Sequence, residues 1–331
     1  MAKPQKAINT VISEFRRLYA KNNSAPVIAL SGGVDSIALL FCVSLLNIKV
    51  KPVFVFHGIR SKKEENKSYD AALNACIKLG VGPLVSCSTS NINQNMTEDT
   101  ARTHRYLRLE SCAGKNGIIA TAHHADDQLE TMIMRLCRGS GIHGLAAIPP
   151  SSRIPIPIPG SDCKVIRPML QICKDDCIEI CEQNNLLWHE DVTNKDTKIT
   201  RNKIRQEVLP ILKGLYPKAS RHASEAAFKL RDISDLVESR VVYIKKFEIA
   251  SVVIVEVSRN VLREEKDAPI AEYVRDVASR MNDGKMLDRI NSTMLEKLIH
   301  SIRSRNPSSF DWPGMKIEVN REMVHFEKTV E

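Results

Sequence analysis

The chain has 331 residues, of which 43% are hydrophobic and 26% charged, a composition typical of a globular protein with room for two domains. No segment approaches the ~20 consecutive apolar residues of a membrane-spanning helix, and no secretory signal is evident, so the sequence predicts a cytoplasmic protein of bacterial type or an organellar one. The net charge of +9 favours a polyanionic partner such as nucleic acid, and the nine cysteines form no CxxC pair, which argues against a disulfide scaffold.

Strand and helix patterns alternate over the first half of the chain, after an amphipathic N-terminal helix. Such alternation predicts a parallel sheet wrapped by helices, with ligands bound at the carboxyl ends of the strands. Apolar runs predict strands at 27–30, 51–56, 84–87 and 118–122, and helical patterns follow at 37–46, 64–80 and 97–115.

The segment Ser31-Gly32-Gly33-Val34-Asp35-Ser36 joins the first predicted strand to a helix. The N–H groups of a helix N-terminus bind anions, glycines let a phosphate approach the backbone, and serine hydroxyls add donors. A Walker A loop ends in Gly-Lys-Ser/Thr, but here Asp35 stands close to that place. Because a carboxylate beside a triphosphate requires Mg²⁺ between them, the loop predicts ATP cleaved at the α-phosphate rather than an ordinary glycine-rich turn.

A second polar cluster, from His123 to Thr131, opens a helix directly after the fourth predicted strand. Asp127 and Glu130, at positions i and i+3, share a face toward the strand ends. Two carboxylates on one face repel each other unless a cation lies there, and that cation could be Mg²⁺ or an amino group of a substrate. The alternative is that they only complement the helix dipole.

Arginines on two further predicted helices add the positive charge that the loop lacks. Arg102 and Arg105 are predicted to help Mg²⁺ neutralise the phosphates. Arg201 and Arg205 lie one turn apart on a predicted helix over 201–212, whose inward side is predicted to carry Ile204, Val208 and Ile211 or Leu212. With Asn202 beside them, they are predicted to position RNA or an activated nucleotide. In both cases a solvated helix face is the alternative.

The second half of the chain begins with a proline-interrupted edge or loop over 151–169 and a helix over 174–185. The character changes near residues 215–218, where we place a domain boundary. The remaining residues predict a smaller, mostly helical domain, with helices at 219–246, 268–281 and 293–303 and a strand at 252–257.

The sequence SGGVDS, together with HHADDQLETMIMRLCRGSGIHGLAAI, resembles the tRNA(Ile)-lysidine synthetases, a family of PP-loop ATP pyrophosphatases. The resemblance continues in RPML (167–170), WHEDVTN (188–194) and TRNKIRQEVLP (200–210). It implies an α/β fold in which residues 1–215 form a Rossmann-like, parallel-sheet PP-loop domain of the adenine nucleotide alpha hydrolase type. Residues 216–331 would then be a mainly helical, tRNA-binding C-terminal domain, as in the shorter form of the family.

The resemblance implies that the wobble cytidine of a CAU-anticodon tRNA(Ile) is adenylated at its C2 oxygen, and that the ε-amine of L-lysine then displaces AMP. ATP and Mg²⁺ are the implied cofactors, and a homodimer is compatible with this activity. The implied catalytic residues are Asp35, Asp127, Glu130, Arg105 and Arg205. The implied ATP contacts are Ser31, Gly32, Gly33, Asp35, Ser36, His57 and Arg102, with Mg²⁺ at Asp35. The implied lysine and tRNA contacts are His124, Asp127, Glu130, Arg201, Asn202 and Arg205.

Three alternatives remain open at this point. A PP-loop tRNA thiolase generally needs paired cysteines, a small-molecule ATP-pyrophosphatase ligase needs an ammonia source, and a catalytically idle RNA-binding protein leaves the acidic and phosphate-binding residues unexplained. The leading hypothesis requires Asp35 to lie near Asp127 and Glu130 at one rim of the sheet, with these carboxylates open to solvent.

Overall fold

The computed structural model describes residues 3–20, 24–56, 58, 61–88, 98–156, 158, 160–190, 200–240, 245–249, 252–281, 290–304 and 306–328. By their contacts these residues form two compact units. The first comprises Met1–Glu130 and Ile148–Glu225, and the second comprises Thr131–Ala147 and Ala226–Glu331. The predicted boundary between residues 215 and 216 therefore falls inside the first unit as the contacts define it.

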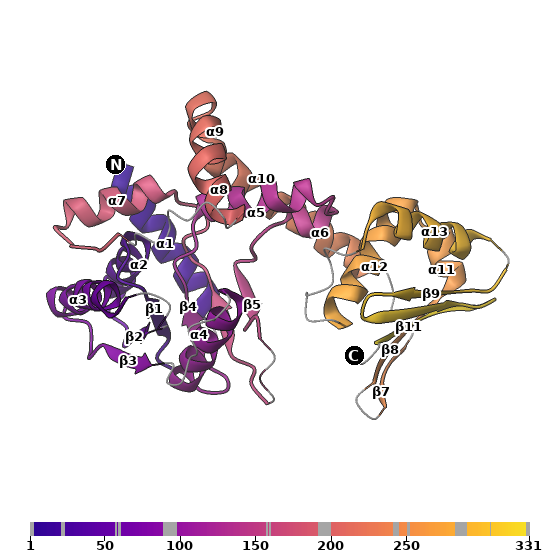
Figure 1. Ribbon diagram of the computed structural model, residues 1–331, viewed down its shortest axis with the longest axis horizontal. Helices are drawn as coiled ribbons and strands as arrows, with labels where there is room; N and C mark the ends of the chain where they lie inside the picture. Colours follow the sequence, from indigo (N-terminus) through magenta and orange to yellow (C-terminus); the bar gives the residue numbers. More distant parts are fainter. Residues whose placement is uncertain are drawn as a thin grey trace. The chain divides into compact units, whose positions relative to one another are not determined.

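The first unit contains a six-stranded sheet in the order β3-β2-β1-β4-β6-β5 (Figure 1). All its neighbouring strands are parallel except β5, which is an antiparallel edge strand. β1 pairs with β2 on one side and with β4 on the other, so the strands are added first toward one edge of the sheet and then, from β4 on, toward the other edge. Folds of this type bind ligands at the point where this order reverses. The strands are β1 (Val27–Leu30), β2 (Lys51–Phe56), β3 (Val85–Ser88), β4 (Ile118–Ala120), β5 (Ser151–Arg153) and β6 (Lys164–Ile166).

Helices cover both faces of this sheet, as the alternating pattern predicts. Ile28 and Leu30 point to one face and pack against α1, α2, α3 and α7. Val27 points to the other face, which is covered by α4 through Tyr106 and Leu109. This two-sided burial explains why β1 is apolar throughout. The helices are α1 (Lys3–Tyr19), α2 (Val34–Ser44), α3 (Lys62–Leu79), α4 (Glu98–Ala113), α5 (Ala125–Cys137) and α7 (Lys174–Gln183).

The predicted helix over 201–212 is three consecutive helical segments, α8 (Thr200–Lys203), the π-helical η2 (Ile204–Val208) and α9 (Leu209–Leu215). Pro210 has no N–H, so the carbonyl four residues earlier loses its α-helical partner, and the Leu209 N–H bonds to Ile204 O, five residues back. The wider turn shifts the helix phase. Leu209 is buried while Val208 is exposed, so the predicted inward face was wrong at Val208, and of the two residues predicted as alternatives Ile211 is exposed and Leu212 is half-buried.

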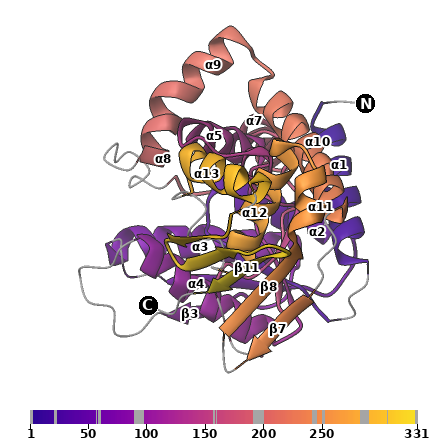
Figure 2. The same cartoon turned by 90° about the vertical axis from the view of Figure 1, so that its right-hand side faces the viewer.

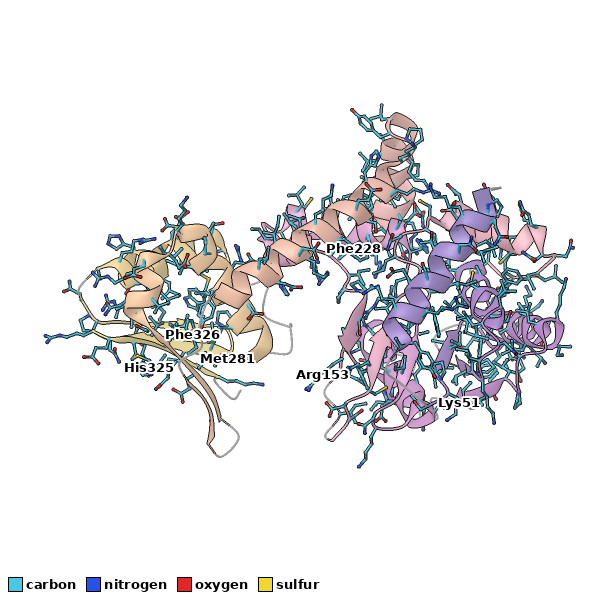
Figure 3. The ribbon with its side chains drawn as sticks, turned by 180° about the vertical axis from the view of Figure 1, so that it is seen from behind. Lys51, Arg153, Phe228, Met281, His325 and Phe326 are labelled. Carbon is cyan, nitrogen blue, oxygen red and sulfur yellow. The ribbon has the colours of Figure 1, made fainter. Side chains whose placement is uncertain are left out.

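The second unit contains more sheet than the sequence predicts. Its five strands form an antiparallel sheet in the order β7-β8-β11-β10-β9, and helices α11 to α13 pack against one face of it (Figure 2). Phe326 and Met281 belong to the resulting core, whereas His325, the neighbour of Phe326 in its strand, is partly exposed (Figure 3). The elements are α6 (Ile142–Leu145), α10 (Ala219–Arg240), β7 (Lys245–Ile249), β8 (Val252–Ser258), α11 (Arg259–Glu264), α12 (Asp267–Met281), α13 (Ser292–Arg303), β9 (Ser308–Trp312), β10 (Met315–Val319) and β11 (Met323–Lys328).

In the part of the chain that the structure describes, no helix has the length and apolar character needed to cross a membrane. The long helix predicted over 219–246 ends earlier, at Arg240, and the strand β7 occupies the rest of that stretch after residue 244. The strand predicted at 252–257 is confirmed as β8.

Gly32 is required both for its backbone conformation and for close packing. Its φ is +75°, and a Cβ there would lie 2.0 Å from Ser68 O in α3. Gly80, the cap of α3, has a similar φ of +61° but nothing within 4 Å of a Cβ. We expect Gly80→Ala to lower the free energy of unfolding by about 1–2 kcal/mol, the cost of positive φ alone, and Gly32→Ala by about 2–5 kcal/mol, because overpacking adds to that cost.

Urea unfolding followed by Trp188 fluorescence would measure both effects. Trp188 packs against the core of the first unit, and the only other tryptophan, Trp312, can be replaced by phenylalanine so that it does not contribute. Equal losses for the two glycine variants would contradict the packing argument at Gly32.

Candidate active site

The loop between β1 and α2 is held by its own serines. Ser36 Oγ donates to Gly33 O at 2.9 Å and accepts from the Ser31 N–H at 3.2 Å. The Gly32 carbonyl in turn accepts from the His189 N–H at 2.9 Å. Gly33 is the N-cap of α2, so no side chain caps the first turn of this helix. The loop thus presents the anion-binding geometry that the sequence predicts.

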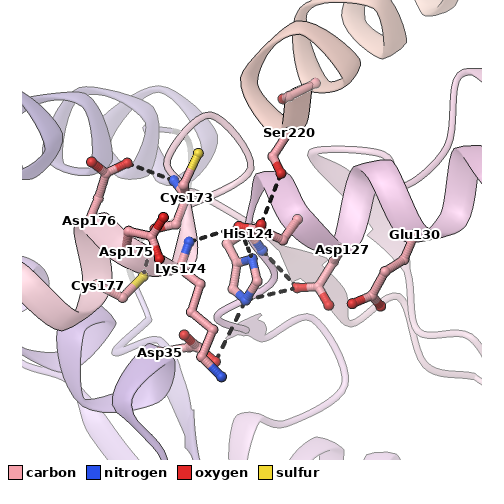
Figure 4. Close-up of polar contacts among 12 residues, drawn as sticks. Asp35, His124, Asp127, Glu130, Cys173, Lys174, Asp175, Asp176, Cys177 and Ser220 are labelled. Carbon is pink, nitrogen blue, oxygen red and sulfur yellow. Dashed lines mark hydrogen bonds and ion pairs between the residues drawn. The ribbon is translucent and has the colours of Figure 1, made fainter. Parts of the chain in front are cut away.

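Asp35, in the first turn of α2, is joined to the second polar cluster through His124 (Figure 4). His124 Nε2 lies 3.7 Å from Asp35 Oδ2 and 3.6 Å from Asp127 Oδ2. His124 Nδ1 lies 3.5 Å from Asp126 Oδ2. The required proximity of Asp35 to Asp127 is therefore present, and a buried imidazole lies between the two carboxylates.

His124 is a cation in this environment. Burial alone would lower the pKa of its imidazole, but the charge of Asp127 and the contacts with Asp126 and Asp35 outweigh burial and raise the pKa well above its usual value. The adjacent His123 behaves in the opposite way. Burial lowers its pKa to about 3, with Asp127 opposing the shift and the nearby Arg167, Arg105 and Arg201 adding to it. Two neighbouring histidines thus carry different charges at neutral pH.

Asp127 and Glu130, which we call the acid pair, are covered by Arg201 and Arg205, the arginine pair. Glu130 Oε2 accepts from Arg201 Nε at 2.9 Å and from Arg205 Nη2 at 3.0 Å, and Glu130 Oε1 accepts from Arg205 Nε at 2.5 Å. Asp127 Oδ1 accepts from Arg201 Nη2 at 3.0 Å and from Arg205 Nη2 at 3.1 Å. Asp127 Oδ2 accepts from the His124 N–H at 2.9 Å. Every oxygen of the acid pair therefore has a donor.

The predicted opening of the acid pair to solvent was wrong. The Glu130 side chain is 0% exposed and that of Asp127 is 9% exposed, whereas the guanidinium side chains of Arg201 and Arg205 are 31% and 33% exposed. The predicted cation on the acidic face is thus present, but the chain itself supplies it. Burial would raise the pKa of Asp127, but His124, His123, Arg201 and Arg205 lower it below its usual range, so the carboxylate is ionised.

Asp126 does not face the acid pair. Its oxygens accept from the Lys174 N–H at 2.8 Å, from Lys213 Nζ at 3.1 Å and from Ser220 Oγ at 2.9 Å. Lys213 and Ser220 are not among the predicted site residues, because they lie 87 and 94 residues away along the chain and no local pattern links them to Asp126. Asp126 therefore holds the first turns of α7 and α10 close to His124, and it also binds Lys213 of α9.

Arg102 and Arg105 lie on a different side of the site, around Tyr106 in α4. Their guanidinium carbons are 6.0 and 5.4 Å from the centre of the Tyr106 ring. The buried Tyr106 hydroxyl interacts with the side chain of Arg167. Arg167 is also buried nearby, and burial lowers its pKa. Of the remaining predicted residues, Asn202 is half-buried in α8, and His57 lies outside the described residues.

Comparison with protein families matches the PP-loop domain over residues 4–212. The chain belongs to the PP-loop family. The PP-loop match ends just before the last turn of α9, so it includes the nucleotide loop, the acid pair and the arginine pair.

Curated relatives of this PP-loop chain include tRNA(Ile)-lysidine synthases from several bacteria. The protein of Hydrogenovibrio crunogenus is 31% identical over 242 residues, which are 69% of this chain and 56% of that protein. The protein of Coxiella burnetii is 32% identical over 226 residues, 65% of this chain and 49% of that protein. The chain thus spans about half the length of these curated relatives.

A solved structure of a U34-tRNA thiolase from Methanococcus maripaludis shares the fold. It superposes with a TM-score of 0.53 at 18% identity, covering 69% of this chain and 78% of the thiolase. At this identity the likeness shows the fold alone.

The environment of Asp126 predicts a loss of stability in acid. Burial raises its pKa, but His124, the Lys174 N–H and Lys213 lower it by more, so it lies below the unfolded value of about 3.9. A carboxyl group with a lowered folded-state pKa contributes its full stability above the unfolded pKa and loses it as pH falls toward the folded one. We expect Asp126→Asn to cost about 2–3 kcal/mol at pH 7 and progressively less below about pH 4.

Urea unfolding at pH 7 and pH 3, followed by Trp188 fluorescence in the Trp312→Phe background, would measure this difference. Asp175→Asn is the matched control, because the Asp175 side chain is 63% exposed and also contacts Lys213. A cost for Asp126→Asn that is the same at both pH values would contradict the assignment.

Proposed function

We propose that this PP-loop protein is a tRNA(Ile)-lysidine synthetase, which adenylates the wobble cytidine of a CAU-anticodon tRNA(Ile) and then joins L-lysine to it. The observation that carries the proposal is the convergence of the nucleotide loop and the acid pair on His124, within 3.7 Å of Asp35 and 3.6 Å of Asp127. The similarity to curated lysidine synthases over most of this chain supports the same activity.

In the first step the loop between β1 and α2 binds the phosphates of ATP. The N–H groups of the uncapped first turn of α2 and the hydroxyl of Ser31 are the donors, while Ser36 Oγ, which donates to Gly33 O, holds the loop in place. The C2 oxygen of the cytidine attacks the α-phosphate, the bond between the α- and β-phosphates breaks, and pyrophosphate leaves with its electron pair. Arg102 and Arg105, both in α4, supply positive charge toward the phosphates in place of a loop lysine.

Asp35 suits a role as a ligand of Mg²⁺. Among the described residues its Oδ1 is buried without a hydrogen-bond partner, and a carboxylate oxygen is the kind of ligand that Mg²⁺ prefers. Mg²⁺ bound there would neutralise phosphate charge and thereby stabilise the leaving pyrophosphate. This fits the presence of a carboxylate at the place where a Walker A loop has lysine.

In the second step the ε-amine of lysine attacks C2 of the adenylated cytidine. The C2–O bond breaks, AMP leaves with the electron pair of that bond, and the amine nitrogen gives up its proton. The acid pair orients the ammonium, and Asp127 or Glu130 accepts the proton. Because the amine has a solution pKa near 10.4, a carboxylate in a water-poor site is needed to hold it and to take its proton.

A lysidine synthetase is favoured over the alternative enzymes by the degree of similarity. Relatives at about 31% identity are lysidine synthases, while the thiolase shares only the fold at 18% identity. An ammonium-binding role also accounts for two carboxyl side chains on one face of α5, which thiolation does not require.

The direct test is incubation of the protein with labelled lysine, ATP, Mg²⁺ and a CAU-anticodon tRNA(Ile) transcript. We expect lysine to enter the RNA with one pyrophosphate and one AMP released per lysine, because both products follow from the two steps. A transcript with the wobble cytidine replaced by uridine is the control. Sulfur or ammonia transfer without lysine incorporation would refute the proposal.

The two steps should be separable by substitution. We expect Asp35→Ala to reduce pyrophosphate release by about 10²–10³-fold, because it removes charge stabilisation at the phosphates. Glu130→Gln should reduce lysine incorporation far more than pyrophosphate release, because it acts at the amine. Single-turnover measurements of both products would show the split, and an equal loss of both in Glu130→Gln would contradict its placement.

A further inference from the structure

The acid pair and the arginine pair together form an electrically balanced cluster of two carboxylates and two guanidinium groups. Asp127 and Glu130 carry two negative charges, and Arg201 and Arg205 carry two positive charges over five hydrogen bonds of 2.5 to 3.1 Å. Since each oxygen of the pair already has a donor, a lysine ammonium cannot be added to the site. It can only replace an arginine, because an added cation in a buried neutral cluster would be uncompensated.

The arginines can leave only if their charge is satisfied elsewhere. Each of the two arginine side chains is about one-third exposed while it contacts the carboxylates, so solvent and a ligand can reach it. A guanidinium binds phosphate and carboxylate in the same two-point geometry, so a phosphate group is an equivalent partner. Arg205 also interacts electrostatically with Asp35, which places it on the side of the nucleotide loop.

The local backbone is suited to such an exchange. Arg205 lies in the π-helical segment η2, between α8 and α9, where the regular hydrogen-bond pattern is interrupted at Pro210. π-helical turns are rare and are found frequently at functional sites. Residues 204–208 contain no buried residue, so a shift of this turn does not disrupt the core.

We propose that Arg201 and Arg205 close the acid pair in the free protein and release it when their guanidinium groups bind phosphate, so that lysine binding follows phosphate binding. This inference rests on the proposed function, for which it sets the order of binding. A phosphate of bound RNA and the phosphates of ATP offer the same chemistry, and the experiment separates them. The order keeps free lysine from occupying the site before an electrophile is present.

The test measures the accessibility of Glu130 without requiring catalysis. The protein is treated with a water-soluble carbodiimide and glycinamide, and mass spectrometry follows amide formation at Glu130. Asp175, whose side chain is 63% exposed, reports reagent activity, and Asp176, at 1% exposed, reports that the fold is intact. The arms are the protein alone, with α,β-methylene ATP and Mg²⁺, with an anticodon stem-loop RNA, and with both ligands.

We expect Glu130 to be protected in the free protein and to react at least about fivefold faster with a phosphate ligand, the lower end of typical coupling between sites. Acceleration by the nucleotide alone assigns the phosphate to ATP, and acceleration by RNA alone assigns it to RNA. Unchanged protection in every arm would overturn the inference.

Variants provide an independent check. Arg205→Gln should expose Glu130 without any ligand, while Asp176 stays protected. Arg153→Gln is the matched control and should behave as the wild type, because Arg153 is an 82% exposed partner of Asp162 on the edge strand β5 (Figure 3). Continued protection of Glu130 in a folded Arg205→Gln would overturn the inference.

The outcome is distinguishable from that of the proposed function. Labelling that responds to phosphate, without lysine incorporation into RNA, would uphold the arginine exchange and reject lysine as the substrate. Lysine incorporation with unresponsive labelling would uphold the activity and reject the exchange. Equilibrium dialysis of labelled L-lysine gives a second readout, and we expect its affinity to rise at least about fivefold in the labelling arm that exposes Glu130.

Discussion

The organisation of the first unit depends on the compensation of buried negative charge at the ends of β1 and β4. Asp35, Asp126, Asp127 and Glu130 meet there, and their counter-charges are His124, Arg201, Arg205 and Lys213. Buried carboxylates are stable only when paired and hydrogen-bonded. Because three of the four cations come from residues 201–213, this segment is attached to the first unit by charge as well as by the buried Leu209. The exposure of Val208 and Ile211 agrees with that description.

The parts of this fold that sequence predicts are those set by local chemistry. The strand Val27–Leu30 is flanked by a polar segment and a glycine turn, so its bounds follow from the residues themselves. The position of Asp35 and of the acid pair at the strand ends follows from the parallel topology, which alternation implies. These predictions needed no knowledge of which distant residues pair, and the structure places them at the same edge of the sheet.

The parts that could not be predicted depend on distant partners. The pattern at Asp127 and Glu130 indicates that a cation is needed, but it does not distinguish a ligand from an arginine 71 to 78 residues away. The helical face of 201–212 was predicted with a constant 3.6-residue period, and the π-helical turn before Pro210 breaks that period. In the second unit the short strands β9 to β11 pair only with one another and with β8, so none carries a strong signal alone.

The charge balance between the acid pair and the arginine pair sets how much free energy an amine could gain by binding there. If the acid pair were open, lysine would bind with the full attraction of two carboxylates, and any other amine would bind nearly as well. When the amine must replace a guanidinium, only the difference between the two sets of hydrogen bonds contributes to affinity, so weakly matched amines gain nothing. In the proposed exchange the arginines would have a second use, because guanidinium groups that leave the acid pair would bind phosphate and compensate its charge. A single pair of side chains can in this way serve both steps of the proposed reaction, first as the cover of the amine site and then as partners of the phosphates.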